Sequence, residues 1–518
     1  PADHALGACE QITVTNTSEQ TISLTFTLPE RSAAAYGRGT KGVYVVEVSH
    51  TGTNIQLPIG KTYSYEITIT ARIAHQQTPV LYAATELRAR RKRIRELCGR
   101  AVLKTGNPEI DTMFRLAKLR AGESLFDTLT GLRHNPGGKT FYAATWCNDQ
   151  VEYAGPWFAC TGDKKANLAS INAYLDYIPF MSDLFTKIPS SVIAEGLDIW
   201  EGAGDRGDAA MYLYGASLFT LLRADSKVTE TLWPAIQWCA EYCHRKMLPD
   251  GVIGSDSDEL EGRFPTDGVA NLSTSCLCYG GLGLAAILAD ELNESSLAQI
   301  YRTRQKNLGL AIECYFGETL HGFHTYRYTK GHDTLRSWIC LPLCVGLTQR
   351  AEGTLQALFS DYLWTEEGML TCERGEENKS NTIWDRSTLF GFKGAFLNGY
   401  IEPVWPFFES YCKKRLLCER VPYAIEAYPE GGMRQLSGES ALFCRIITEG
   451  LLGIRPEGFS SFSFIPQLPK ALPQLYLTDL VLFGKSIDIL VEKNNYEVRV
   501  DGKTAAKGPL GQRVPIHV

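Results

Sequence analysis

The sequence predicts a mainly α-helical fold: an (α/α)6 barrel, or six-hairpin toroid, flanked by an N-terminal β-sandwich portion and a small C-terminal antiparallel β domain. Three observations support this prediction. Strand patterns occupy both ends of the chain, two kinds of helical segment alternate between them, and the connections between helices are alternately long and short. At roughly 150 residues per domain, a chain of 518 residues has room for this organisation.

Residues 1–80 are predicted to form part of a β-sandwich. Four runs alternate polar with β-branched or aromatic residues between Gly, Asn, Ser or Pro boundaries, namely 11–16, 21–28, 42–48 and 62–71. Four strands make an incomplete sandwich, so we expect a leader or an earlier part of this domain to precede Pro1. Residues 81–104 are predicted to be a linker, because Glu86–Leu103 is a charged helical segment whose arginines would cover the next domain.

Residues 105–455 are predicted to form the barrel. Segments with a single apolar stripe are 108–127, 164–178, 228–247, 294–316, 352–364 and 402–418. Segments that are apolar or small nearly all round are about 149–160, 207–224, 269–291, 334–349, 387–399 and 439–453. A helix that is apolar all round must be surrounded by protein, so the alternation predicts six inner and six outer helices in two rings. Residues 456–518 return to strand patterns and form the C-terminal β domain.

The long connections all precede inner helices, so they are expected on one face of the barrel. They are 128–148, 179–206, 248–268, 317–333, 365–386 and 419–438, and they are rich in acidic, arginine and aromatic residues. Long polar loops on a rigid scaffold are where binding sites are found. Sugars bind to such residues, because hydroxyls need polar partners and pyranose faces stack on indoles, and acetal cleavage needs an acid and a base or nucleophile.

Two glutamates in this set are the leading catalytic candidates. Glu152 and Glu426 lie among aromatic residues, where desolvation would raise a carboxyl pKa toward the range of a general acid. The candidate substrate-binding residues are Trp146, Asp149, Arg206, Asp208, Asp267, His332, Asp333, Arg336, Trp384, Asp385 and Arg386. An acid just before a helix is often only a cap, so Asp208, Asp267, Asp333 and Asp385 are equally well explained as N-caps. The pairs Asp205–Arg206 and Asp385–Arg386 are also explained as buried ion pairs that order loops.

Composition and motifs exclude several other classes. The formal charge is −6 with no sustained basic face beyond Arg88–Arg95, which argues against an electrostatic nucleic-acid binder. No nucleotide-binding glycine motif occurs, so no cofactor is expected. His321 and His324 lack a carboxylate at the spacing of a zinc motif, so no metal is expected. No uncharged run of about 18 apolar residues is evident, which argues against a membrane span. The 15 cysteines contain no CxxC pair and are read as mostly reduced core residues.

Over about 105–518 the chain resembles the six-hairpin glycosidases, the (α/α)6-barrel glycoside hydrolases that include bacterial α-L-rhamnosidases, trehalases and glucoamylases. Trp146–Glu152 (WCNDQVE) is similar to the acidic motif of rhamnosidase-like members, and Ala424–Tyr428 (AIEAY) lies where they place a second glutamate. Leu451–Pro456, with Gly458-Phe459 and Ile465-Pro466, resembles the junction that leads into their C-terminal β domain. The resemblance implies that Glu152 is the general acid and Glu426 the general base. In another branch of the six-hairpin glycosidases the acid comes from a loop in the middle of the barrel, so Asp205, Asp208 and Asp267 stay rival acids. Glu439 stays a rival base.

The resulting hypothesis is an exo-acting, inverting glycoside hydrolase that removes a terminal sugar from an oligo- or polysaccharide. The motif has Gln150 and Val151 where its relatives carry an arginine, so the sugar stays open between a rhamnose-like residue and a uronic acid held by Arg206, Arg336 and Arg386. The alternatives are a polysaccharide lyase acting on uronates through a Tyr or His base, and a non-catalytic carbohydrate-binding protein. No signal peptide is recognised in the chain, and both a periplasmic and a cytoplasmic location in a bacterium stay open.

Overall fold

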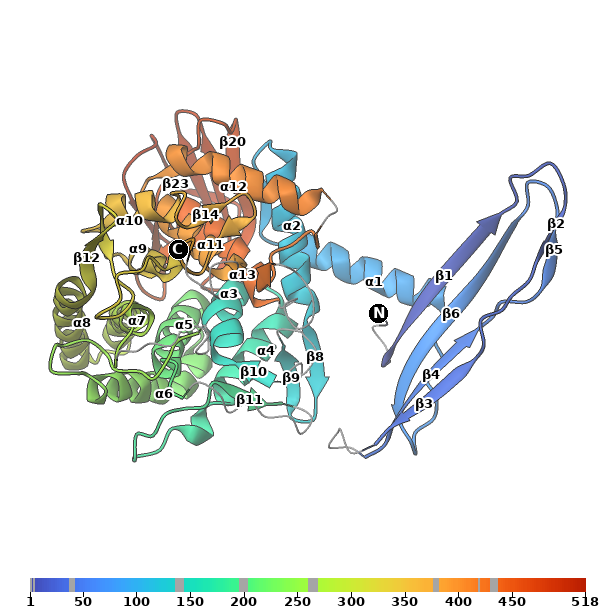
Figure 1. Ribbon diagram of the computed structural model, residues 1–518, viewed down its shortest axis with the longest axis horizontal. Coiled ribbons are helices and arrows are strands. Elements are labelled where there is room, and N and C mark those ends of the chain that lie inside the picture. The colour runs from blue at the N-terminus through green and yellow to red at the C-terminus, as the bar shows by residue number, and fades with distance from the viewer. Residues whose placement is uncertain are drawn as a thin grey trace. The chain divides into compact units, whose positions relative to one another are not determined.

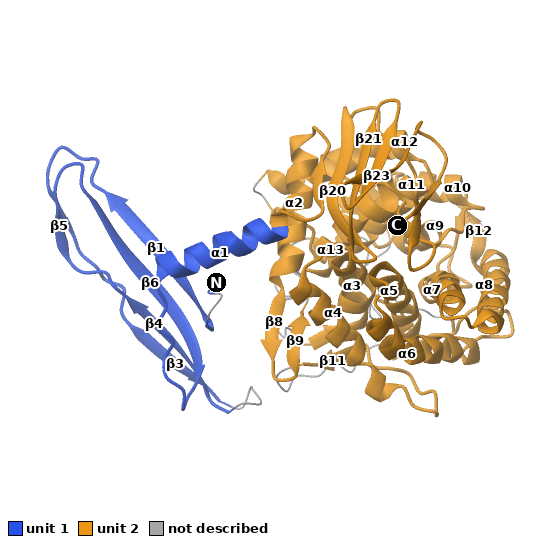
Figure 2. Cartoon of the chain, turned by 180° about the vertical axis from the view of Figure 1, so that it is seen from behind, with its two compact units in different colours: residues 1–97, 195–197 blue, residues 98–194, 198–518 orange. Residues whose placement is uncertain are grey.

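The computed structural model describes residues 2, 5–36, 42–135, 144–194, 204–259, 269–375, 382–417, 420–428 and 437–518. The chain divides into two compact units (Figure 2). Unit 1 comprises residues 1–97 and 195–197, and unit 2 comprises residues 98–194 and 198–518.

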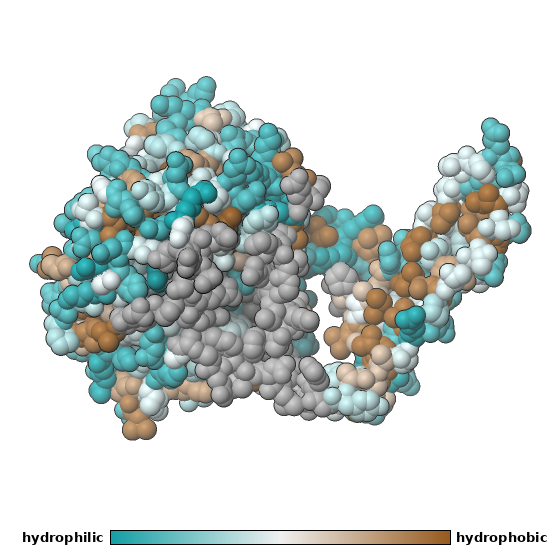
Figure 3. Space-filling view, viewed as in Figure 1, coloured by the Kyte–Doolittle hydropathy of each residue, from teal (hydrophilic) through white to brown (hydrophobic). Residues whose placement is uncertain are grey.

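Unit 1 is built on one antiparallel sheet in the order β1-β6-β4-β3. Its strands are β1 (Gly7–Thr15), β3 (Arg31–Ala35), β4 (Tyr44–His50) and β6 (Thr62–Ile73), and β2 (Ile22–Leu24) pairs separately with β5 (Ile55–Leu57). Apolar side chains remain exposed on this unit, among them Leu6, Val46, Ile69 and Val80. Figure 3 shows brown, apolar patches on the surface of this unit. The described residues of this unit provide one sheet layer, so the second layer of a sandwich stays a prediction.

Helices form at each of the segments that the sequence marked as helical in the barrel region. The amphipathic set is α2 (Pro108–Glu123), α4 (Lys164–Leu175), α6 (Ser226–Arg245), α8 (Ser295–Phe316), α10 (Ala351–Leu358) and α12 (Ile401–Leu416). The apolar set is η1 (Cys147–Ala154) with α3 (Gly155–Ala159), α5 (Asp208–Arg223), α7 (Leu272–Glu291), η3 (Ser337–Cys340) with α9 (Leu341–Val345), α11 (Asp385–Leu397), and α13 (Gly438–Arg445) with η4 (Ile446–Leu451). Figure 1 shows how these helices gather in unit 2.

The apolar helices pack against one another in chain order. η1 contacts α5, α5 contacts α7, α7 contacts α9, α9 contacts α11 and α11 contacts η4, while α13 returns to η1. Every residue of α5 from Asp208 to Leu222 is buried, whereas α6 buries mainly the stripe that includes Leu232, Ile236, Cys239 and Cys243. This difference in burial confirms the two kinds of helix that the sequence predicted.

Helix α7 corrects one expectation. By length and composition it could cross a membrane, although we expected no such segment from the sequence. Of its most apolar window, 83% is buried inside the protein, as in the core helix of a globular fold. Most of the described cysteines are likewise buried, in the environment predicted for them.

The predicted linker helix ends earlier than expected. α1 (Ala83–Cys98) stops before Gly99, a residue type that favours helix ends, and Ala101 adopts a positive φ of 47°. The next residues form β7 (Val102–Lys104), which pairs with β20 (Gln474–Leu482) near the C-terminus. The prediction of helix as far as Leu103 was therefore wrong, because β-branched Val102 and its neighbours complete a distant sheet.

The C-terminal strands contact the C-terminal ends of two apolar helices. They form a sheet in the order β23-β22-β21-β20-β7 and a second one, β18-β19-β24, with β18 (Arg455–Pro456), β19 (Ser461–Phe464), β21 (Lys485–Glu492), β22 (Tyr496–Val500), β23 (Lys503–Gly508) and β24 (Val514–His517). Val481 N donates to Cys160 O at the end of α3 (2.8 Å), and Phe483 N donates to Leu222 O near the end of α5 (2.9 Å). The N-terminal ends of the apolar helices, opposite these contacts, follow the long connections.

Short elements lie within those long connections. They are the ladders β8 (Leu125–Thr128) with β9 (Gly131–His134), β10 (Ala144–Trp146) with β11 (Ser191–Ile193), β12 (Gly317–Leu320) with β13 (Phe323–Tyr326), β14 (Trp364–Thr365) with β15 (Gly368–Met369), and β16 (Ile383–Trp384) with β17 (Ala427–Tyr428), and the short helix η2 (Ile178–Phe180). The β16–β17 pair brings Trp384 beside Ala427, so Glu426 and Asp385 become neighbours. Two candidate segments about forty residues apart in sequence are thereby joined.

Candidate active site

Arg386 is the centre of a buried cluster of carboxylates at the N-terminal ends of the apolar helices. Its Nη2 lies 2.6 Å from Glu439 Oε1 at the start of α13 and 3.1 Å from Asp149 Oδ1 in η1, and its Nη1 lies 4.0 Å from Glu259 Oε2. Burial opposes the charge of this guanidinium, but Glu439, Asp149, Glu259 and Glu426 outweigh it and raise the Arg386 pKa. The structure therefore gathers four acidic residues from four separate segments around one cation.

Aromatic rings flank the same guanidinium. The Arg386 guanidinium carbon lies 5.0 Å from the centre of the Tyr153 ring and 5.3 Å from that of Trp384. Both rings are buried, and both come from segments that the sequence placed at this site. The cation–π contacts fix the arginine, so the carboxylates bonded to it are fixed as well.

Glu152 lies next to this cluster without a direct partner for its carboxyl group. Its side chain is fully buried, and neither carboxyl oxygen has a hydrogen-bond partner within the described part of the chain. Burial raises the Glu152 pKa to about 8, although Arg445, Lys393, Arg386 and Arg206 act in the opposite direction. The carboxyl therefore keeps its proton near neutral pH, which is the state that a general acid needs.

Glu259 belongs to the cluster as well, although the sequence analysis did not select it. The Tyr153 hydroxyl donates to Glu259 Oε2, and Oε1 has no hydrogen-bond partner among the described residues. Burial together with the neighbouring charge of Glu152 raises the Glu259 pKa well above its usual range. The available signal was its place in the acidic run Asp256–Glu261, but nothing there distinguishes it from the other acids.

The sequence-adjacent acid–arginine pairs do not bond to each other. Arg206 Nη2 bonds to Asp208 Oδ1 (2.8 Å), and Asp208 Oδ2 accepts from Ser190 Oγ (2.9 Å). Asp385 pairs with Arg415 from the amphipathic helix α12 and accepts from Ile425 N (3.0 Å). The predicted pairings Asp205–Arg206 and Asp385–Arg386 are therefore replaced by others, because neighbouring residues at a helix start point in different directions.

Asp208 and Asp385 are alternatively predicted to be helix N-caps. Asp208 and Asp385 are the first residues of α5 and α11, and the N-cap positions belong to Gly207 and Trp384. Neither cap makes a side-chain hydrogen bond to the helix. Asp208 and Asp385 thus bond to other segments instead of capping their helices.

Asp205, a rival acid from the sequence, is held by a turn. Its Oδ1 accepts from Gly207 N (2.9 Å), and its Oδ2 accepts from the Tyr242 hydroxyl (2.6 Å) and lies 3.7 Å from Lys246 Nζ. Burial raises its pKa against these bonds. With both oxygens engaged, the geometry favours a role in ordering the loop before α5.

The remaining candidates are dispersed. Trp146 is buried in β10 and lies 5.8 Å from the Arg206 guanidinium, and Arg336 at the start of η3 lies 5.3 Å from the Tyr328 ring. His332 is half-buried and Asp333 is exposed, both in the segment before η3. Asp267 lies outside the described residues.

Neither histidine of the His321–His324 pair forms part of a metal site. His321 Nε2 lies 2.9 Å from Glu373 Oε2, and His324 Nδ1 lies 3.0 Å from Arg350 Nη1. Within the described ranges, no group of three or more His, Cys, Asp or Glu residues could hold a metal ion.

Comparisons with known proteins identify the fold. The sequence matches no protein-family model and no curated protein. Among solved structures, a sialidase matches with a TM-score of 0.63 and 14% identity, over 89% of this chain and 47% of the other. A protein described as a kojibiose phosphorylase from the human microbiome gives 0.59 and 10%, over 99% and 82%. The α-L-rhamnosidase from Dictyoglumus thermophilum gives 0.56 and 13%, over 96% and 55%.

These matches define the class of fold. The chain shares its overall fold with these carbohydrate-active proteins. It spans about half the length of the sialidase and of the rhamnosidase. At 10% to 14% identity the likeness shows the fold alone, and the chemistry has to be argued from the residues of this chain.

Proposed function

We propose that this protein is an exo-acting glycoside hydrolase that releases a terminal sugar with inversion. The observation that carries the proposal is the cluster of four carboxylates around Arg386, in a fold shared with glycosidases. Both protonated and ionised carboxyls are needed to cleave an acetal, and raised pKa values at Glu152 and Glu259 beside directly ion-paired Asp149 and Glu439 favour that combination.

The barrel arrangement supports an exo-acting pocket. We propose that the apolar helices form an inner ring and the amphipathic helices an outer ring, as their order of contacts suggests. The C-terminal strands contact the ends of α3 and α5. We therefore propose that the entrance and the pocket lie at the opposite ends of the apolar helices. Such a pocket receives the end of a sugar chain.

In the proposed reaction, Glu152 protonates the glycosidic oxygen and Glu426 activates a water molecule on the other side of the ring. Inverting enzymes keep these two carboxyls about 6.5–9.5 Å apart to leave room for the water. Glu259 is the rival acid, because it shares the raised pKa, and Glu439 is the rival base, because Arg386 holds it in place.

The terminal sugar is proposed to be uncharged and rhamnose-like. A uronic acid would need an arginine available for its carboxylate. Arg386 is already paired with Asp149 and Glu439, and Arg206 with Asp208, so a uronate would have to displace carboxylates of the protein itself. This pairing weighs against a uronate held by Arg206 or Arg386.

Product release from a panel of aryl glycosides, rhamnosides and glucuronides included, tests the proposal. Glu152→Gln should lower kcat by about 10³-fold or more on substrates whose leaving group needs protonation, and Glu426→Gln should do so on all substrates. Glu352→Gln, the same change at an exposed position of α10, is the matched control and should leave kcat unchanged. Proton NMR of the first product formed identifies inversion from its anomeric signal.

Each contrary result identifies a different error. If Glu152→Gln cleaves normally, the acid is Glu259 or lies elsewhere in loops 179–206 and 248–268, and Glu259→Gln separates these two cases. A product that absorbs in the ultraviolet, formed without uptake of water, would instead indicate a lyase. Sugar binding without turnover on the whole panel, unaffected by Glu152→Gln, would indicate a non-catalytic carbohydrate-binding protein.

A further inference from the structure

A second site is suggested by a cavity at the other end of the inner helices. The cavity has a volume of about 410 Å³ and is lined by Leu218 of α5, Leu284 of α7, Val345 of α9, Asn398 after α11 and Arg455 of β18. These positions lie in the C-terminal parts of their helices, whereas Arg386 and Glu439 lie at helix starts. The cavity is therefore distinct from the candidate active site.

The charge of the cavity is strongly unbalanced. Its described lining contains the three cations Lys393, Arg455 and Arg513 but a single carboxylate, Glu449. That carboxylate is already paired with two cations. Lys393 Nζ lies 2.5 Å from Glu449 Oε2, and Arg445 Nη2 lies 2.9 Å from the same oxygen. Positive charge remains in excess after these pairs are formed.

Glu449 and Lys393 form the floor of the cavity with Arg445 next to them, and their contacts with one another keep all three charged. Burial opposes ionisation of Glu449, but Arg445 and Lys393 outweigh it and lower its pKa to about 2. Burial likewise opposes the charge of Lys393, but Glu449 outweighs it and raises that pKa. Lys393 and Arg445 together face one carboxylate, so the floor carries a net positive charge near neutral pH.

The cations at the mouth are only partly compensated by the protein. Arg455 is exposed and forms no ion pair with any other described residue. Arg513 donates to Gly453 O (2.7 Å) and Ser463 Oγ (3.0 Å), which orient its guanidinium. Burial and the neighbouring charge of Arg455 lower the Arg513 pKa, although the charge of Glu457 acts in the opposite direction. An anion placed between these groups would relieve that repulsion.

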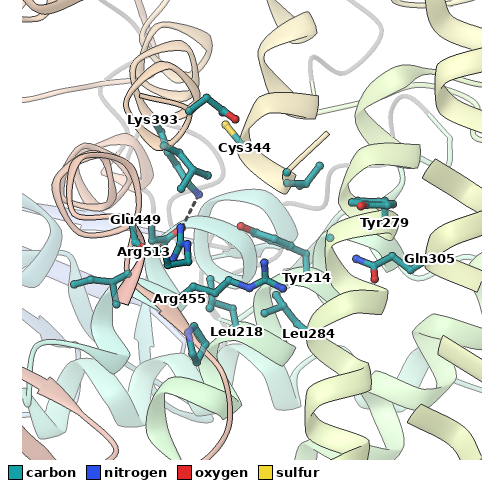
Figure 4. A pocket seen from close by; sticks show the side chains of 18 residues that line it. Tyr214, Leu218, Tyr279, Leu284, Gln305, Cys344, Lys393, Glu449, Arg455 and Arg513 are labelled. Carbon is teal, nitrogen blue, oxygen red and sulfur yellow. Dashed lines mark hydrogen bonds and ion pairs between the residues drawn. The ribbon is translucent and has the colours of Figure 1, made fainter. Parts of the chain in front are cut away.

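The uncharged walls are suited to a ring. The side chains of Tyr214 and Tyr279 line the cavity with the Gln305 amide, and Figure 4 shows them around the same space as Lys393 and Arg455. Gly280 allows Val345 and Tyr214 to pack closely against α7, since a Cβ at this position would lie 2.9 Å from Val345 Cγ1 and 3.1 Å from Tyr214 Cδ2. Aromatic faces and an amide bind the faces and hydroxyls of a sugar-like ring.

We propose that this cavity binds a small organic anion of monosaccharide size, with its phosphate or carboxylate on Arg455 and Arg513 and its ring against Tyr214 and Tyr279. The volume lies within the range of small-molecule sites, roughly 300–1,000 Å³. Charge-assisted hydrogen bonds from the two arginines, above a floor of net positive charge, give selectivity for an oxyanion. This inference does not depend on the hydrolase proposal, because it concerns the opposite end of the helices.

Isothermal titration calorimetry on the whole chain, in a low-salt buffer free of phosphate, tests the inference. The probes are glucose 6-phosphate, glucuronate, glucose and inorganic phosphate. At least one of the two sugar anions should bind, and glucose should bind more weakly by about tenfold or more, because it lacks the charge. The tighter of glucose 6-phosphate and glucuronate identifies the anionic group that the site prefers.

The variants locate the binding. Arg455→Gln should weaken the sugar anion by about tenfold or more, and the exposed position makes loss of folding unexpected. Lys306→Gln removes the same charge from an exposed position of α8 beside Gln305 and should change nothing. The proposal is overturned if neither sugar anion binds, if Arg455→Gln binds them as the parent does, or if inorganic phosphate binds as tightly as glucose 6-phosphate. These readouts need no turnover.

Discussion

Glu152 is a buried glutamate of η1 and Glu449 is a half-buried glutamate of η4, and their pKa values move in opposite directions. Burial raises the Glu152 pKa to about 8, since the nearby cations do not bond to its carboxyl group. For Glu449, Arg445 and Lys393 contact the carboxylate itself, outweigh burial and lower the pKa to about 2. Direct contact with a cation therefore separates a proton donor from a fixed negative charge.

The raised pKa of Glu152 predicts a pH-dependent cost to stability. In the unfolded chain Glu152 loses its proton near its ordinary value of 4.5, but in the folded protein it keeps the proton until about pH 8. The unfolded state thus releases protons first, and stability falls as the pH rises through this window. Glu152→Gln should stabilise the protein at pH 7 by on the order of 3 kcal/mol, and below pH 4 the difference should vanish. Urea denaturation at both pH values checks this. The same stability difference between parent and variant at pH 7 and below pH 4 would contradict it.

The opposite sign is predicted for Glu449. Glu449→Gln leaves Lys393 and Arg445 buried without their counter-charge, which should cost about 3–5 kcal/mol at pH 7. Glu366→Gln makes the same change at an exposed position that pairs with Lys414 and should leave stability nearly unchanged. Equal effects of the two variants on urea denaturation would show that the buried triad does not contribute as the contacts suggest.

At the scale of elements, η1 differs from the regular helix that the sequence predicts over 149–160. Cys147–Ala154 forms a π-helix and continues as α3 from Gly155. The wider turn occurs where Asp149, Glu152 and Tyr153 must all face the interior. π-Helical turns are frequent at functional sites, but they have no signature in hydrophobic periodicity.

The crossing of η1 and α5 depends on one glycine. A Cβ at Gly215 would lie 2.1 Å from Val151 O and 2.9 Å from Glu152 Cα, so the two backbones must separate if it is added. Gly215→Ala should lower stability by about 1–3 kcal/mol and displace Glu152. Ser217→Ala, a change of one atom at an equally buried position of α5, should be nearly neutral. Thermal unfolding of both variants tests this, and an unchanged melting temperature for Gly215→Ala would exclude the close crossing.

At the scale of the molecule, the core of unit 2 extends from the start of the unit to its last strand. Its buried apolar residues run from Ala101 to Ile516, and β7 closes the edge of the C-terminal sheet beside β20. Lys118 Nζ also donates to Cys98 O (3.2 Å) and Ala101 O (3.2 Å). Residues that the sequence assigned to a linker thus contribute to this core.

Truncation tests this boundary. A fragment of residues 98–518 should fold and melt within a few degrees of the whole chain, because it keeps its own core. A fragment of residues 106–518, close to the barrel boundary expected from the sequence, removes β7 and buried Leu103 and should lose at least about 2 kcal/mol. Calorimetry of both fragments distinguishes them, and equal melting temperatures would place the boundary after β7.

The sequence by itself determined the type and order of the helices, because the width of an apolar stripe is a local property of hydrophobic periodicity. It also indicated the ends of the helices at which acidic and aromatic residues gather. It could not determine which acid meets which arginine: Arg386 bonds to Asp149, 237 residues away, and not to its neighbour Asp385. Nor could it reveal that Lys393, Arg445 and Glu449, on otherwise apolar helices, meet at a second cavity. Ion pairing and pKa values depend on distance and burial, and only the tertiary structure fixes these.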